Sequence, residues 1–136
     1  MMISVDTIVN SNIEKVWKNW SDPEAVMKWN YASDDWHCPK ASNDFKPGGN
    51  FNYTMSSKDG KNSFDFVGMY TEIKPLQNIE ITLGDGRKVS VSFEAVDDQN
   101  TIVTESFDTE ETNSVDLQRT GWQAILDNFR IYCESK

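Results

Sequence analysis

The sequence predicts an α+β fold in which a curved antiparallel sheet of about six strands wraps around a long C-terminal helix, with two short helices after the first strand. Three observations lead to this prediction. Apolar and polar residues alternate in a series of segments between residues 51 and 107, and short turns rich in Asp, Asn and Gly separate them. The last segment instead carries one wide apolar stripe at helical spacing. Short turns between successive strands indicate an antiparallel meander.

The N-terminal part predicts the first strand and the two short helices. Residues 3–9 alternate between apolar-type and polar side chains, which is the period of a strand with one buried face. Residues 10–12 supply capping oxygens for a helix, whose apolar residues recur at helical spacing until Pro23 breaks the run. A second short helix is expected to begin at that proline, with Val26 and Met27 on its apolar side.

The rest of the chain predicts further strands and the long helix. Period-two alternation returns after Gly48 and Gly49, and the last helix is expected over residues 114–132. The acidic residues 108–111 are expected to form a solvated loop before that helix, where negative charge suits the helix dipole. The remaining strands are expected at residues 51–55, 64–73, 79–83, 88–96 and 101–107.

Composition narrows the class of partner. The chain has 136 residues and a formal net charge of −9, and its lysines and arginines are scattered along the sequence. Phosphate backbones and anionic membranes attract concentrated basic faces, so we expect no nucleic-acid partner. The length fits a single domain spanning residues 1–136.

The location is expected to be cytoplasmic. The start of the chain lacks the basic flank and apolar run of a signal peptide. No later segment approaches the length of apolar chain that spans a bilayer, so no membrane insertion is expected. Cys38 and Cys133 lie far apart without a CxxC motif, which favours two free thiols in a reducing compartment over a disulfide framework.

Several short motifs occur together in one order and spacing. They are Val16-Trp17, Asp22-Pro23-Glu24, Trp29, Gly48-Gly49-x-Phe51, Gly68-x-Tyr70 and Gly121-Trp122. With this order of elements, the chain resembles the START-related helix-grip superfamily called SRPBCC, and more narrowly the branch named after the activator of the heat-shock-protein-ninety ATPase. The resemblance covers essentially the whole chain, and residues 29–37 resemble a small bacterial subgroup of that branch.

The resemblance implies a helix-grip fold with a cavity between the sheet and the long helix. In many relatives this cavity accepts lipids, polyketides or other apolar molecules. In the eukaryotic activator, a domain of this type accompanies a separate N-terminal chaperone-binding domain, which finds no counterpart among these 136 residues. Interaction with a chaperone is therefore an alternative and not the main expectation.

One set of aromatic, aliphatic and sulfur-bearing side chains has the alternation or helical spacing needed to face the space between sheet and helix. Packed solid, the set is a hydrophobic core; with part of the space open, as the resemblance implies, it lines a ligand cavity. Periodicity alone does not distinguish the two. The set comprises Trp36, Phe51, Tyr53, Met55, Phe66, Tyr70, Phe107, Trp122, Leu126 and Phe129.

Glu105 is a further candidate ligand-binding residue, because it falls on the same alternation as Val103 and Phe107 and hence on the predicted inner face. An inward carboxylate is costly unless it is paired. It would then contact a ligand hydroxyl, Arg87 or Arg119, or titrate at a raised pKa suited to proton transfer. The alternative, a bulge that turns Glu105 to solvent, is the preferred interpretation.

His37 is the only histidine and lies close to Asp34 and Asp35 in sequence. A neighbouring carboxylate could orient it as a catalytic base, but a structural hydrogen-bonding role is the preferred interpretation. His37 and Cys38 are adjacent and no second histidine exists, so too few ligands are present for a zinc site. We expect no metal and no cofactor.

The sequence features and the resemblance together suggest three functions from different classes. The first is a non-enzymatic protein that encloses a small, lipid-like, polyketide-like or aromatic apolar molecule, oriented by polar groups such as Tyr53, Glu105 or His37. The second is a cyclase-type or isomerase-type enzyme that uses His37 or Glu105 as general base. The third is a module that interacts with a chaperone and stimulates its ATPase. The first is preferred, because the sequence lacks a dense cluster of polar groups.

Overall fold

A seven-stranded antiparallel sheet and three helices make up the computed structural model of the protein, which describes residues 1–135. The strands lie in the order β1-β7-β6-β5-β4-β3-β2, so every neighbouring pair except β1 and β7 is consecutive among the strands of the chain. The elements are β1 (Met2–Val9), α1 (Ile13–Ser21), α2 (Pro23–Trp29), β2 (Trp36–Asn43), β3 (Asn50–Ser57), β4 (Ser63–Lys74), β5 (Asn78–Leu83), β6 (Lys88–Asp97), β7 (Asn100–Asp108) and α3 (Val115–Glu134).

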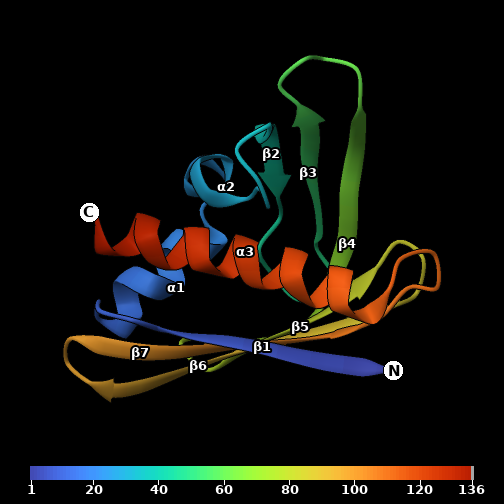
Figure 1. The fold of residues 1–136 in the computed structure, drawn as a ribbon. Coiled ribbons are helices and arrows are strands. Elements are labelled where there is room, and N and C mark those ends of the chain that lie inside the picture. Colours follow the sequence, from blue (N-terminus) through green and yellow to red (C-terminus); the bar gives the residue numbers. More distant parts are fainter. Residues whose placement is uncertain (136) are drawn as a thin grey trace.

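The sheet bends around α3 (Figure 1). Strands β1, β7, β6 and β5 run beneath the helix, whereas β4, β3 and β2 rise beside it. The helix lies on the concave side of the sheet, which confirms the helix-grip fold predicted from the sequence. Alternate residues of a strand point to this side: in β7, Thr101, Val103, Glu105 and Phe107 are buried and the residues between them are more exposed.

Two short helices follow β1. Asn12 caps α1, and its side-chain oxygen accepts a 2.8 Å hydrogen bond from a backbone N–H of the first turn. Asp22 ends α1 and caps α2, where Pro23 occupies the first turn as predicted. Val26 is completely buried, but Met27 is 37% exposed. The expectation that Met27 lies on the apolar side of α2 is therefore wrong, because the buried side of this helix does not include it.

The long helix α3 carries the predicted apolar stripe. Ser114 caps it by accepting a 3.1 Å hydrogen bond from a first-turn backbone N–H, and the last helical residue is Glu134. Leu126, Phe129 and Cys133 lie at spacings of three and four and are completely buried. The stripe therefore fixes which side of α3 faces the sheet.

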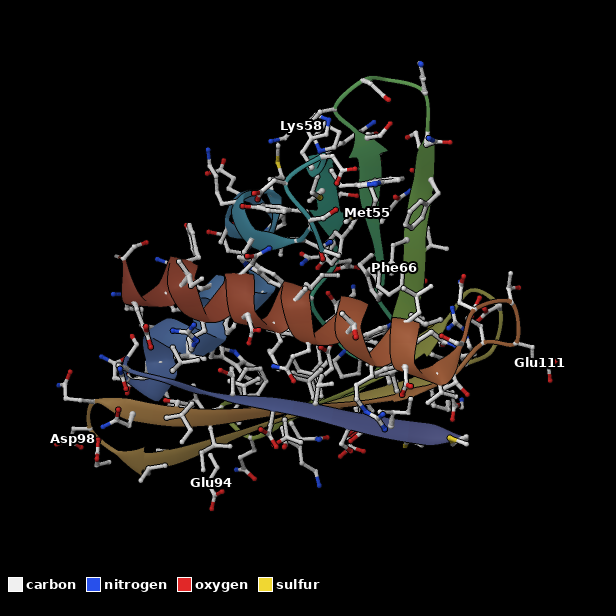
Figure 2. The ribbon with its side chains drawn as sticks, in the orientation of Figure 1. Met55, Lys58, Phe66, Glu94, Asp98 and Glu111 are labelled. Carbon is white, nitrogen blue, oxygen red and sulfur yellow. The ribbon has the colours of Figure 1, made fainter. Side chains whose placement is uncertain are left out.

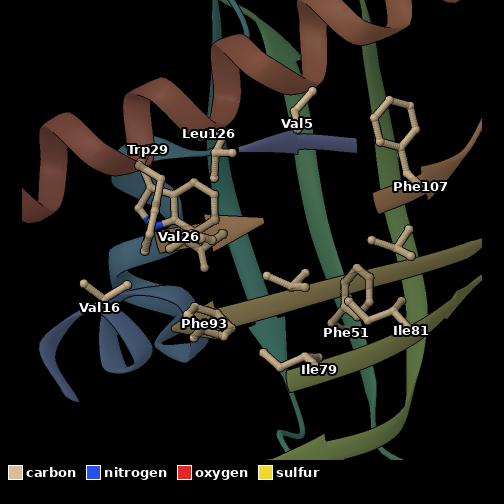
Figure 3. Close-up of a cluster of buried hydrophobic side chains, with 14 of the residues drawn as sticks. Val5, Val16, Val26, Trp29, Phe51, Ile79, Ile81, Phe93, Phe107 and Leu126 are labelled. Atoms are coloured by element: carbon tan, nitrogen blue, oxygen red, sulfur yellow. The ribbon is translucent and has the colours of Figure 1, made fainter. Parts of the chain in front are cut away.

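An aromatic cluster fills the core next to α1 and α2. Trp20 and Trp29 each meet the ring of Phe129 edge to face, with ring centroids 4.9 Å apart in both pairs. Phe93 of β6 contacts Trp20 with ring centroids 6.0 Å apart. Figure 3 shows Trp29 and Leu126 gathered beneath α3 in this cluster. This cluster packs α1 and α2 against α3 and the sheet.

No strand was predicted over β2, which forms one edge of the sheet beside β3. Regular alternation is lost there because Pro39 lies inside the strand and a bulge shifts the pairing between His37 and Lys40. Proline has no backbone N–H, and an edge strand is one of the few positions in a sheet that tolerates it. The sheet therefore has seven strands, more than the sequence predicted.

Both cysteines are free and buried, as the sequence predicted: Cys38 lies in β2 and Cys133 in α3. Burial raises the pKa of the Cys133 thiol to about 11 and also raises that of Cys38. Both thiols therefore stay protonated near neutral pH. In the described part of the chain, residues 1–135, none of the helices has the length and apolar character needed to span a bilayer.

Candidate functional site

A cavity of about 350 Å³ lies between α3 and the inner face of the sheet, a volume within the range of small-molecule sites. Strands β3 to β7, all three helices and the loop before α3 contribute to its walls. Figure 2 shows Met55 and Phe66 on the two strands, β3 and β4, that rise beside the helix. The lining residues are Trp20, Trp29, Asn30, Phe51, Tyr53, Met55, Phe64, Phe66, Tyr70, Ile81, Leu83, Arg87, Val89, Glu105, Glu110, Asn113, Gln118, Trp122 and Ile125.

The wall formed by β3 and β4 is aromatic. Phe51 lies at its centre, with its ring centroid 4.9 Å from that of Tyr53, 5.7 Å from Phe66 and 5.4 Å from Tyr70. Gly68 is paired with Phe51 across the two strands, and a Cβ atom there would lie 2.7 Å from the Phe51 ring. The missing side chain at Gly68 therefore lets the Phe51 ring lie close against β4.

The opposite wall is one face of α3. Gln118, Trp122 and Ile125 line the cavity, and their spacing of four and three residues places them on the same side of the helix. Trp122 contacts both parts of the bent sheet. Its ring stacks on Phe107 of β7 with centroids 4.1 Å apart, and it meets Phe66 of β4 edge to face at 6.2 Å. Trp122 therefore closes the space between the helix and β4.

Glu105 faces the cavity from β7. It pairs in unbroken register with Val5 of β1 and Val91 of β6, so the bulge preferred from the sequence is wrong and the inward orientation is confirmed. Only 7% of Glu105 is exposed. Among residues 1–135 no group donates a hydrogen bond to its carboxyl group, and burial alone raises its pKa to about 8. Glu105 is therefore protonated at neutral pH.

The two arginines considered as partners of Glu105 pair with other residues. The Nε atom of Arg87 donates a 2.8 Å hydrogen bond to Oδ2 of Asp85. Arg119 is exposed and lies 3.5 Å from Asp116, one helical turn away. Within the described part of the chain, Glu105 therefore has no cationic partner.

Tyr53 and Tyr70 bring two hydroxyl groups to the cavity wall. Their oxygens lie 3.3 Å apart, and Asn43 donates a 3.2 Å hydrogen bond from Nδ2 to the Tyr53 hydroxyl. Asn43 is itself held by a 2.8 Å hydrogen bond to the carbonyl oxygen of Ser21. Burial raises the pKa of both tyrosines, so both hydroxyls stay protonated. The pair offers a fixed position for a hydrogen-bonding group of a ligand.

One end of the cavity is polar, and Arg87, Glu110, Asn113 and Gln118 form this polar end. Glu110 donates a 2.9 Å hydrogen bond from its backbone N–H to Oε1 of Gln118, and its own Oε1 accepts one of 2.7 Å from the backbone N–H of Asn113. The β7–α3 loop and the β5–β6 turn lie at the same end of the molecule (Figure 1). The acidic run expected as a solvated loop thus folds back and contributes Glu110 to the cavity.

The structure divides the sequence-predicted site residues between the cavity and its surroundings. Phe107, Leu126 and Phe129 are completely buried in the core behind the cavity, and Trp36 lies outside it, with its ring 5.9 Å from that of Phe64. His37 is exposed on β2 and does not line the cavity. In residues 1–135 no group of three or more His, Cys, Asp and Glu side chains could hold a metal ion. The predicted residues that line the cavity are Phe51, Tyr53, Met55, Phe66, Tyr70, Glu105 and Trp122.

Comparison with known proteins identifies the family. The model of the family described as Activator of Hsp90 ATPase homolog 1-like protein matches residues 10–134. The chain belongs to this family. An AHSA1-like protein from Aeromonas hydrophila is 39% identical, with a TM-score of 0.92 over 99% of this chain and 93% of that chain. A protein from Cytophaga hutchinsonii is 52% identical, with a TM-score of 0.84 over 98% of this chain and 92% of that chain. No curated protein matches the sequence.

The AHSA1-like assignment confirms the SRPBCC resemblance drawn from the sequence motifs. The fold persists at much lower identity: a Chromobacterium violaceum protein is 18% identical, yet its TM-score is 0.88 over 98% of each chain. The AHSA1-like fold, with its helix held against a curved sheet, is consistent with a ligand-binding domain.

Several residues of this AHSA1-like cavity were missed by the sequence reasoning. Gln118 had a usable signal, because it lies one helical turn before Trp122 on the same face. Asn30 had none: its place in the cavity depends on the path of the chain after α2, where its Nδ2 donates a 3.3 Å hydrogen bond to Sδ of Met55. The missed residues are Trp20, Trp29, Asn30, Phe64, Ile81, Leu83, Val89, Glu110, Asn113, Gln118 and Ile125.

Proposed function

We propose that this protein binds a small, mostly apolar molecule of lipid-like, polyketide-like or aromatic character between α3 and the sheet. The observation that supports this function is the cavity itself, which has a volume of about 350 Å³ and eight aromatic residues among its nineteen lining residues. Protein interiors rarely contain voids much larger than a water molecule. A mostly apolar space of this size with a few polar groups is typical of a ligand site.

The walls supply different kinds of contact. The apolar part of a ligand would lie between Trp122 on the helix and Phe51 and Phe66 on the strands. Its polar groups would meet the hydroxyls of Tyr53 and Tyr70 or the carboxyl group of Glu105. A few polar contacts of this kind orient a ligand, while apolar burial provides most of the affinity.

Binding is tested by recording backbone amide NMR spectra of the ¹⁵N-labelled protein while adding lipids, flavonoids and aromatic polyketides. Saturable shifts are expected around Tyr53, Glu105 and Trp122. The variant Ile125→Trp fills the cavity and should abolish these shifts, whereas Ile131→Trp, at an exposed position of the same helix, should preserve them. Binding by Ile125→Trp as strong as that of the wild type would contradict the proposed location.

Glu105 favours a second candidate function, a cyclase-type or isomerase-type enzyme in which its carboxylate acts as general base. Its place in the cavity and a pKa of about 8 suit proton transfer at weakly alkaline pH, where its carboxylate form becomes abundant. Glu105→Gln should then abolish turnover of a carbonyl compound found to bind, while His37→Ala should leave it intact because His37 lies outside the cavity. Unchanged turnover by Glu105→Gln would eliminate this candidate.

The third expected function, interaction with a chaperone ATPase, rests on the family name alone, so we do not propose it. The cytoplasmic location expected from the sequence forms part of the proposal. It is supported by Cys38 and Cys133, which are both free and buried, as is usual in a reducing compartment.

A further inference from the structure

We propose that the ligand of this cavity carries a protonated amine, and that the carboxylate of Glu105 is the counter-ion of this amine. The inference rests on the proposed binding function and narrows it to one chemical class, apolar amines. Three features of the cavity support it: an unpaired carboxyl group, walls rich in aromatic rings, and the lack of a free cation on its lining.

The first feature is the isolation of the Glu105 carboxyl group. Glu105 is 7% exposed and lines the cavity, and its partners on the neighbouring strands are Val5 and Val91. No other group among residues 1–135 forms a hydrogen bond or an ion pair with it. Among these residues no fully buried side-chain oxygen or nitrogen lacks a hydrogen-bond partner, so the carboxyl oxygens of Glu105 reach the open space of the cavity, where a ligand can supply the missing contact.

The second feature is the chemistry of the walls. Trp122, Phe66, Phe51 and Tyr70 present aromatic rings to the cavity from the helix and from two strands. Aromatic faces attract cations electrostatically, and the attraction increases when the cation is removed from water. Rings of this kind in the same cavity as the Glu105 carboxyl group would stabilise an ammonium group, and they would contact the apolar remainder of the same ligand.

The third feature is the charge on the rest of the lining. Arg87, before β6, is already paired with Asp85, and Glu110, before α3, adds a second acidic side chain. Tyr53 on β3 and Tyr70 on β4 stay protonated because burial raises their pKa. Every other lining residue lacks a titratable group. The net charge of −9 of the whole chain also favours the approach of a cation.

Binding of an amine should release a proton. Burial raises the pKa of Glu105 to about 8, so its carboxyl group is protonated in the empty protein at pH 7. An ammonium ion stays protonated when it binds, and the carboxyl group loses its proton to the solvent as the ion pair forms. At pH 7 the expected release is most of one proton per bound ligand.

The test uses three probes with the same aromatic rings: 1-naphthylmethylamine, 1-naphthalenemethanol and 1-naphthoate. Affinity and proton release are measured by titration calorimetry at pH 7 in two buffers that differ in ionisation enthalpy. The amine is expected to bind at least about tenfold more tightly than the alcohol, and the carboxylate least tightly.

Glu105→Gln should remove this preference and the proton release while keeping affinity for the alcohol. Glu94→Gln, which makes the same change at an exposed position of β6, should behave as the wild type (Figure 2).

The outcomes separate this inference from the binding function on which it rests. Equal affinity of the wild type for the amine and the alcohol would overturn the amine assignment and leave cavity binding supported. Failure of all three probes to bind, together with no NMR shifts from the panel of lipids, flavonoids and polyketides, would overturn both. If Glu105→Gln does not fold, the wild-type measurement decides, because equal affinity for the amine and the carboxylate probes contradicts ion pairing with Glu105.

Discussion

The indole ring of Trp122 lies flat on the ring of Phe107, with centroids 4.1 Å apart and an angle of 7° between the two planes. Phe107 is completely buried, whereas Trp122 is partly exposed and lines the cavity. Trp122 therefore marks the boundary between the solid part of the core and its hollow part. The pair holds the middle of α3 against β7, on the side of the cavity opposite the aromatic wall.

Trp122→Ala should lower the free energy of unfolding by about 3 kcal/mol, because it removes a large aromatic side chain and uncovers Phe107. Trp122→Phe keeps an aromatic ring against Phe107 and should cost less. Urea denaturation followed by far-UV circular dichroism measures both changes. Equal losses in the two variants would show that stacking on Phe107 is not the source of the stabilisation.

Glu105→Gln should change how stability depends on pH. Burial raises the folded-state pKa of Glu105 to about 8 from its usual value of 4.5. Between these pH values the folded protein holds one more proton than the unfolded chain, so this group lowers the free energy of unfolding as pH rises, by up to about 1.4 kcal/mol per unit. Its stabilising contribution is complete below pH 4.5 and is lost by about pH 8.

The glutamine variant lacks this titration. The wild type loses stability as pH rises, so the free energy of unfolding of Glu105→Gln minus that of the wild type should increase steadily from pH 5 to pH 8 and then level off. Denaturation curves of both proteins across this range provide the measurement, and Glu94→Gln serves as the exposed control. A constant difference between Glu105→Gln and the wild type would show that Glu105 is not protonated in the folded state.

The two tyrosine hydroxyls on the cavity wall should contribute different amounts to the free energy of unfolding. Tyr53 contacts both Tyr70 and Asn43 through its hydroxyl, so Tyr53→Phe removes one contact from the buried Tyr70 and one from the half-buried Asn43 and should cost about 2 kcal/mol. Tyr70→Phe removes one contact at 3.3 Å and should cost about 1 kcal/mol. Chemical denaturation of the single and double variants measures both losses and their coupling. A double variant whose loss equals the sum of the single losses would argue against a shared network.

A pair of glycine variants separates close packing from helix propensity. At Gly68 a Cβ atom would lie 2.7 Å from the Phe51 ring, so Gly68→Ala must displace this ring and should cost about 2 kcal/mol. At Gly121, inside α3, a Cβ atom would meet nothing within 4 Å, so Gly121→Ala should stabilise the protein by up to about 1 kcal/mol. Thermal and urea unfolding measure both. Opposite signs are expected, and destabilisation by both variants would contradict the interpretation of Gly121.

The sequence predicted the elements whose signal lies in local periodicity. The apolar stripe of α3 and the alternation of β7 depend only on which side of an element is buried, and both are confirmed. The same alternation placed Glu105 inward, and the preferred bulge was wrong because pairing on both sides of β7 is regular at that residue. The β2 strand was missed because Pro39 and the neighbouring bulge interrupt its period.

The polar part of the cavity could not be predicted in this way. Glu110 and Gln118 meet through hydrogen bonds between a loop and a helix, and Asn30 reaches the cavity because of the path that the chain takes after α2. Each contact joins separate elements, so no repeating pattern in the sequence encodes it. The division between solid core and open space has the same origin: Leu126 and Ile125 are neighbours in one helix, but only Ile125 lines the cavity.

The bulge at Pro39 also bears on association between molecules. A strand at the margin of a sheet presents free N–H and C=O groups that can pair with a strand from a second chain, which is a common route to aggregation. In β2 the proline lacks an N–H, and the pairing shifts register between His37 and Lys40. An incoming strand would meet an interrupted row of donors there, so this margin is a poor template for extending the sheet into a fibril.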